Sequence, residues 1–234
     1  MNIGIGIQTY YSIQHVQAAA YMTRQAAKVE AELTGDTAPE AVVLKAYVCS
    51  ALFSSVAFLE ALANEIYADA IRPDGGHLSA LAERDRLMMA SLGETPESVQ
   101  KASILSKYAI LLRAAGKSPL PTDCDPHQAI LTVIRLRNEI VHYKASFFDV
   151  GTEGMVRAGS FHTSKLPSQI KGKFELRRNA QGLSGDSWIG HGLAQWAVKS
   201  ALAYADANFT ALGIKPYYDH VRSNLGTTDD ASNL

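Results

Sequence analysis

The chain has 234 residues, of which 47% are hydrophobic and 19% charged, with a formal net charge of −1. This length can bury a core without disulfides or metals, and the near-neutral charge excludes a protein whose whole surface attracts nucleic acid. A site for a polyanion must therefore be local.

Cysteine usage and hydropathy indicate the compartment. The two cysteines, Cys49 and Cys124, match no metal-ligand spacing, so a reducing cytoplasm is the simplest expectation. The N-terminus lacks the basic start and apolar run of a secretory signal. The longest nearly uncharged apolar segment, residues 46–59, is shorter than the ~20 residues needed to cross a bilayer. We expect no membrane span, no metal and no cofactor.

Helix formers and helix breaks predict the elements in chain order. A first helix is expected over residues 9–33, and a second, with Pro39 in its first turn, runs to residue 72. A short helix at 77–92 and a longer one at 97–115 follow. Asp125 and Pro126 then open a helix over 127–147, and the last long helix spans 187–212. The pattern predicts an all-α bundle of about five or six helices.

Residues 148–186 interrupt this helical pattern. The segment is rich in Gly and Ser, and its apolar alternation predicts a hairpin at 169–178. Between Arg157 and Arg178 it carries six Lys or Arg residues and one acid, Glu175, so this part is either a solvated hairpin or an arm that contacts RNA. The RNA-binding candidates are Lys165, Lys171, Lys173, Arg177 and Arg178. We expect a single domain over residues 1–222 with this excursion, and a disordered tail at 223–234.

The helix at 127–147 carries an arginine among apolar residues. At about 100° per residue, Arg137 falls within a stripe formed by Ile130, Ile134 and Val141. A charge there is expensive unless it is paired or faces a cavity. Glu60 on the second helix is likewise a charged residue on an apolar helix face, and Asn64 borders that face one turn further on. We therefore expect a contact between Glu60 and Arg137.

A histidine near the end of the same helix adds a side chain that can transfer protons. His142 lies one turn after Asn138, whereas Arg137 is displaced from it by about 140°. Arg137 and His142 converge only if the guanidinium curls around the helix or a second copy completes the site. An arginine can hold a phosphate and a histidine can move the proton of a ribose hydroxyl, which suffices for metal-free RNA cleavage. Asn138 would orient the histidine or contact phosphate, and Tyr143 would stack on a base.

At these residues the sequence resembles the HEPN superfamily. The family's mark is an arginine, usually followed by a polar residue, and a histidine after four to six residues; here Arg137 and Asn138 precede His142. The segment FLEALANEIY, with Glu60 and Asn64, is similar to the family's partner helix, and residues 191–209 are similar to its closing helix. The resemblance covers residues 9–212.

The resemblance implies a function and partners. Family members are typically metal-independent endoribonucleases that form homodimers with the two motifs facing each other across a cleft. They often act as toxins or phage-defence effectors, and some have a regulatory antitoxin. We therefore expect RNA as substrate, with Arg137, Asn138 and His142 as catalytic residues. The alternative is a catalytically inactive helical module that binds a protein partner or nucleotide, in which Arg137 and Glu60 form only a core ion pair.

Overall fold

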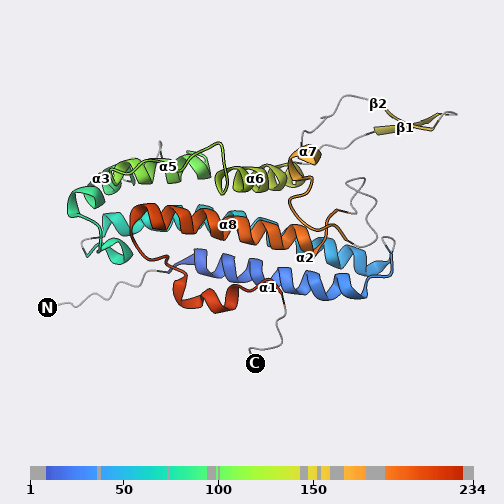
Figure 1. The fold of residues 1–234 in the computed structure, drawn as a ribbon, viewed down its shortest axis with the longest axis horizontal. Coiled ribbons are helices and arrows are strands. Elements are labelled where there is room, and N and C mark those ends of the chain that lie inside the picture. Colours follow the sequence, from blue (N-terminus) through green and yellow to red (C-terminus); the bar gives the residue numbers. More distant parts are fainter. Residues whose placement is uncertain are drawn as a thin grey trace.

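The computed structural model is an all-α bundle with one small hairpin (Figure 1). It describes residues 9–35, 38–72, 74–93, 99, 101–142, 147–151, 154–158, 166–177 and 188–228. This confirms the predicted fold class. Two short 3-10 helices, η1 (Gly76–Leu78) and η2 (Asp219–Leu225), complete the described elements.

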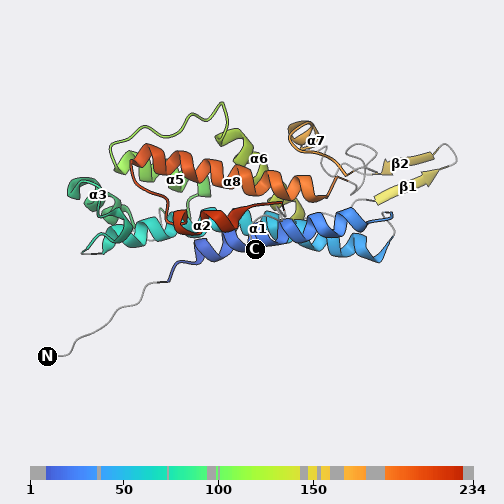
Figure 2. The same cartoon turned by 60° about the horizontal axis from the view of Figure 1, so that its bottom comes forward.

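The first two helices form an antiparallel pair along the long axis of the molecule (Figures 1 and 2). Helix α1 (Tyr11–Glu32) buries small side chains, among them Ala19, Ala20 and Ala26, so its backbone lies close to α2 (Pro39–Ile71). Pro39 occupies the first turn of α2 as predicted, where its missing N–H costs no hydrogen bond. Helix α8 (His191–Leu212) packs on both α1 and α2 and ends at Gly213, which has a positive φ of 77°.

The remaining helices cover the pair from one side. Helix α3 (Glu83–Gly93) lies at one end of the bundle, and α5 (Ile104–Ala114) and α6 (His127–Val141) follow one another beside α8 (Figure 1). Ser103 caps α5, because its hydroxyl accepts the N–H of Ser106 at 3.2 Å. Asp125 Oδ1 accepts the N–H of Ala129 at 3.0 Å in the first turn of α6.

Helix α2 is the core helix of the bundle and the most apolar of the described helices. By length and composition it could cross a membrane, a criterion that the core helix of a soluble protein also meets. Its central residues, including Leu52, Leu59 and Leu62, are fully buried. Helix α2 is packed against five α-helices, namely α1, α3, α5, α6 and α8, and against the 3-10 helix η1.

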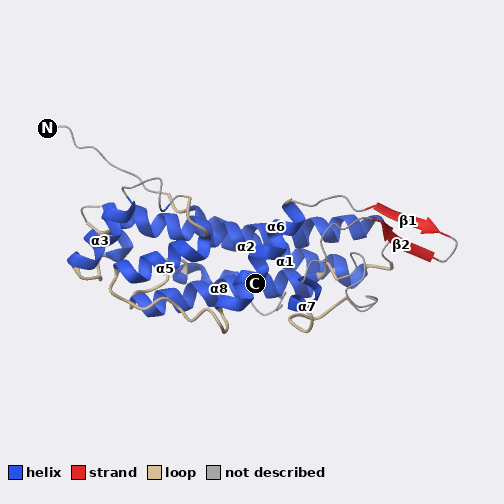
Figure 3. Ribbon diagram, turned by 90° about the horizontal axis from the view of Figure 1, so that it is seen from above, coloured by secondary structure: helices blue, strands red, loops and turns tan. Residues whose placement is uncertain are grey.

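The excursion contains a hairpin, although the predicted position was wrong. Strands β1 (Phe147–Gly151) and β2 (Gly154–Ala158) pair antiparallel, with Val150 opposite Met155, at the end of the bundle away from α3 (Figures 1 and 3). Residues 166–170, within and before the expected hairpin, instead form the short helix α7 (Leu166–Ile170). Alternation of a few apolar residues does not distinguish a strand from one helical turn, which explains this error.

The C-terminal segment is more ordered than expected. Residues 219–225 form η2, and Leu225 and Thr227 are buried. The Arg24 guanidinium on α1 donates to the Gly226 carbonyl at 2.6 Å, and Gln195 Nε2 on α8 donates to the Thr227 hydroxyl at 3.1 Å. The prediction of disorder is therefore wrong for residues 223–228, whereas 229–234 lie outside the described residues.

Candidate functional site

Arg137 lies at the edge of the buried face of α6, not at its centre. That face is formed by Ala129, Val133, Leu136 and the predicted Ile130, because α6 packs against α2 and α8 together. Val141, which the sequence placed in the apolar stripe, is 51% exposed. The predicted apolar stripe was displaced around the helix from the observed buried face, because its position was taken from isoleucine and valine residues alone. Arg137 itself is half-buried.

Glu60, the predicted partner of Arg137, binds a different residue. Glu60 forms its ion pair with Lys107 of α5, and Lys107 Nζ also donates to Asn64 Oδ1 at 3.0 Å. Lys107 is only 2% exposed, so this lysine is one of the buried charged side chains among the described residues. The expected Glu60–Arg137 contact is therefore wrong. The sequence did contain the signal, because Lys107 lies between Ile104 and Leu111 on the apolar face of α5.

The end of α6 presents its polar side chains to solvent. Asn138 and His142 are both exposed, and the His142 N–H donates to the Asn138 carbonyl at 2.8 Å, which closes the last turn. Within the described part of the chain, the side chains of Arg137, Asn138 and His142 form no hydrogen bond or ion pair. These three groups are therefore available to a ligand. Tyr143, the expected stacking residue, lies outside the described residues.

The basic residues of the excursion have different surroundings. Lys171 and Lys173 are exposed, and Lys173 Nζ lies 4.0 Å from Asp125 Oδ2 at the start of α6. Arg177 is 6% exposed and packs beside Gly190 and Glu30, so its position is structural and does not face solvent. Lys165 and Arg178 lie outside the described residues. Of the three candidates that the structure describes, Lys171 and Lys173 are thus exposed to solvent and Arg177 is not.

A buried polar cluster at the start of α1 was not predicted. Glu65 accepts the backbone N–H of Ser12 at 2.8 Å and also binds the Ser12 hydroxyl, while Asp69 accepts the Tyr10 hydroxyl at 2.7 Å. Burial raises the pKa of the Glu65 carboxyl, although its bonds to Ser12 act in the opposite direction. The spacing of Glu65 and Asp69, one turn apart on an apolar helix, was the available signal. Their bonds serve to fix α1 on α2.

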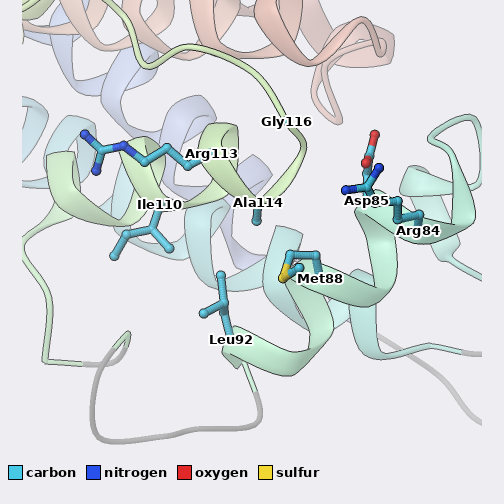
Figure 4. A pocket seen from close by; sticks show the side chains of 8 residues that line it. All are labelled: Arg84, Asp85, Met88, Leu92, Ile110, Arg113, Ala114 and Gly116. Carbon is cyan, nitrogen blue, oxygen red and sulfur yellow. The ribbon is translucent and has the colours of Figure 1, made fainter.

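A pocket of about 380 Å³ lies between α3 and α5 (Figure 4), at the end of the bundle away from the end of α6 (Figure 1). Its apolar lining includes Met88, Leu92, Ile110 and Ala114. Its charged side chains do not converge, because Arg113 points away from Arg84 and Asp85 (Figure 4). None of the residues predicted for catalysis lines this pocket.

Comparisons of the chain with known proteins gave no match: no protein family, no curated protein and no solved structure is similar to it. The function must therefore be argued from the side chains themselves. The end of α6 is the place where a cation, an amide and an imidazole are open to a ligand.

Proposed function

We propose that this protein is a metal-independent endoribonuclease that cleaves single-stranded or loop RNA at the C-terminal end of α6. The observation that carries the proposal is that the side chains of Arg137, Asn138 and His142 have no hydrogen-bond or ion-pair partner among the described residues. Glu60 is already neutralised by Lys107. A half-buried guanidinium without a carboxylate is suited to a phosphate, since it can form two parallel hydrogen bonds to it.

The chemistry is an internal transfer on RNA. The ribose 2′-oxygen attacks the adjacent phosphorus while the bond from phosphorus to the 5′-oxygen breaks. His142 takes the 2′-hydroxyl proton, and the protonated imidazole, of the same copy or of a second one, gives a proton to the leaving 5′-oxygen. Arg137 stabilises charge on the phosphate oxygens, and Asn138 positions the phosphate or the imidazole. The products are a 2′,3′-cyclic phosphate and a 5′-hydroxyl, and no water or metal enters this step.

The positions of Arg137 and His142 at the end of α6 limit how the guanidinium and the imidazole can meet at one phosphate. An ideal helix places Arg137 and His142 about 140° apart, and His142 is the residue that follows the last helical position of α6. Either the arginine reaches around the helix or a second copy supplies one of the groups. The resemblance to HEPN proteins favours a homodimer with a composite site. It also favours a role as a toxin or phage-defence effector under the control of a regulatory protein.

Cleavage of a mixed RNA pool in the presence of a chelator tests the proposal. We expect His142→Ala and Arg137→Ala each to lower the cleavage rate at least about 100-fold, as loss of an acid/base or charge-stabilising group does. The matched controls are His220→Ala and Arg135→Ala, because both residues are exposed and lie outside the proposed site. These two variants should cleave like the wild type.

Other outcomes reject the proposal in distinct ways. Absence of cleavage by the wild type at any protein concentration would favour the inactive binding module. Equal cleavage by the wild type and His142→Ala would place the activity elsewhere. Circular dichroism and thermal unfolding of each variant establish that a lost activity is not a lost fold.

A further inference from the structure

The pocket between α3 and α5 owes its space to small residues at the end of α5. Ala114 is the last residue of α5 and Gly116 follows it, and a Cβ added to Gly116 would meet no atom within 4 Å. Met88 and Leu92, one turn apart on α3, line the same space from the other helix (Figure 4). Protein interiors leave few voids larger than a water molecule, so a space of about 380 Å³ has room for a ligand.

The uncharged lining of the pocket is aliphatic. Its large members are Met88, Leu92 and Ile110, and none of the described residues that line the pocket is aromatic. Such a lining offers no ring on which a planar ligand could stack, so it suits an alkyl chain better than an aromatic group. Met88 is 49% exposed, and its flexible thioether can adapt to a chain that covers it.

The charged side chains lie at different places on the rim of the pocket. Arg84 and Asp85 are neighbours in the first turn of α3, whereas Arg113, in the last turn of α5, points away from both (Figure 4). In the described part of the chain the Arg113 side chain has no hydrogen bond or ion pair. An arginine binds a carboxylate through two parallel hydrogen bonds. Arg113 is therefore suited to an anion, whereas Asp85 repels one from the vicinity of Arg84.

We propose that this pocket binds an aliphatic carboxylate, with the carboxylate on Arg113 and the alkyl chain along the aliphatic lining. At ~30 Å³ for each heavy atom, the volume of one water molecule in the liquid, the pocket holds roughly 13 heavy atoms. This size corresponds to a straight-chain acid of about ten or eleven carbons. The inference is independent of the chemistry proposed for α6, which lies at the other end of the bundle (Figure 1).

The dependence of affinity on chain length tests the fit to the pocket. Calorimetric titrations compare the straight-chain acids from hexanoate to tetradecanoate. Each CH₂ that enters the pocket should tighten binding by about two- to fourfold, and the gain should end at about ten to twelve carbons. For decanoate we expect a Kd between roughly 10 µM and 1 mM. Absence of saturable binding, or an affinity that still rises from dodecanoate to tetradecanoate, overturns the proposal.

The role of Arg113 is tested by changing its charge and the charge of the ligand separately. Arg113→Gln should raise the Kd of decanoate at least about tenfold, because a charged hydrogen-bonded pair is lost. It should leave the binding of uncharged 1-octanol unchanged, which shows that the pocket is intact. Arg84→Gln is the matched control, an exposed arginine beside Asp85, and should change the Kd less than about threefold. An unchanged Kd in Arg113→Gln, or a larger loss in Arg84→Gln, overturns the assignment.

NMR of the methionine methyl groups tests the place of binding. Met88 lines the pocket, whereas the adjacent Met89 is fully buried. The Met88 resonance, assigned through Met88→Leu, should shift in a saturable way with decanoate. Met88→Glu should raise the Kd at least about tenfold, because it puts a carboxylate against the alkyl chain. Leu87→Glu is the matched control, since Leu87 is 56% exposed and does not line the pocket. A Met88 resonance that does not move, or equal effects of the two glutamates, places binding elsewhere and overturns the proposal.

Discussion

At the scale of single residues, Lys107 is the charge on which the contact between α2 and α5 depends. Its Nζ is bound by Glu60 and Asn64, and it is almost fully buried. We expect Lys107→Ala to lower the free energy of unfolding by about 2–3 kcal/mol, from the cavity and the unpaired carboxylate. Lys107→Met, which keeps the stem, should cost about 1 kcal/mol. Urea unfolding measures both, with exposed Lys117→Ala as the control. A Lys107→Ala protein as stable as wild type would contradict this role.

Buried tyrosines predict how stability changes at high pH. Burial, assisted by Asp69, raises the pKa of Tyr10 to about 12, and burial raises the pKa of Tyr204 to about 12. The unfolded phenol ionises near ~10, so the unfolded state releases its proton first. Stability from these groups is therefore complete below pH ~10 and is lost as the pH rises towards ~12. Urea midpoints across this range should fall, and less steeply in Tyr10→Phe. A midpoint that stays constant would refute the prediction.

At the scale of elements, the N-terminus of α8 shows how the bundle holds the excursion. Gly190 provides no capping side chain, and Glu30 Oε2 on α1 instead accepts the His191 N–H at 2.5 Å. A Cβ on Gly192 would lie 2.1 Å from the Glu175 carbonyl oxygen. The segment that follows α7 is therefore packed directly on the first turn of α8.

Gly192→Ala should consequently destabilise the protein by about 1–3 kcal/mol, because backbone must move to make room for the methyl group. Gly35→Ala is the control, since a Cβ there meets no atom within 4 Å. Thermal unfolding gives the stability, and limited proteolysis near Glu175 reports release of the segment. Equal stability and equal cleavage of wild type and Gly192→Ala would show that the contact is not tight.

The sequence predicted those helix ends that depend on the residues at the end itself. Pro39 and Gly213 mark helix ends through their own backbone preferences, and both ends were found. The cap of α8 was not predictable, because Glu30 precedes His191 by 161 positions. The prediction of a Glu60–Arg137 pair was wrong for the same reason, because such a pair depends on how segments far apart in the sequence pack. Glu60 is half-buried on α2 as its pattern indicated, but the pattern does not say which helix faces it.

At the scale of the whole molecule, the bundle was predictable and the interfaces were not. Helical periodicity gives the fold class, which the structure confirms. Burial on α2 depends on which of its sides the surrounding helices cover, so its exposed positions are defined only in the assembled bundle. The open end of α6 is a property of the same assembly. Its polar groups are available because α2 and α8 pack against a different side of the helix.

The most direct test of the central claim is the chemistry at a mapped cleavage position. An RNA oligonucleotide is compared, without divalent metal, with the same oligonucleotide carrying a single 2′-deoxy residue at that position. We expect cleavage of the first to a 2′,3′-cyclic phosphate, no cleavage of the second at that position, and no cleavage of either with His142→Ala. A 3′-hydroxyl product, or equal cleavage of the deoxy substrate, would contradict it.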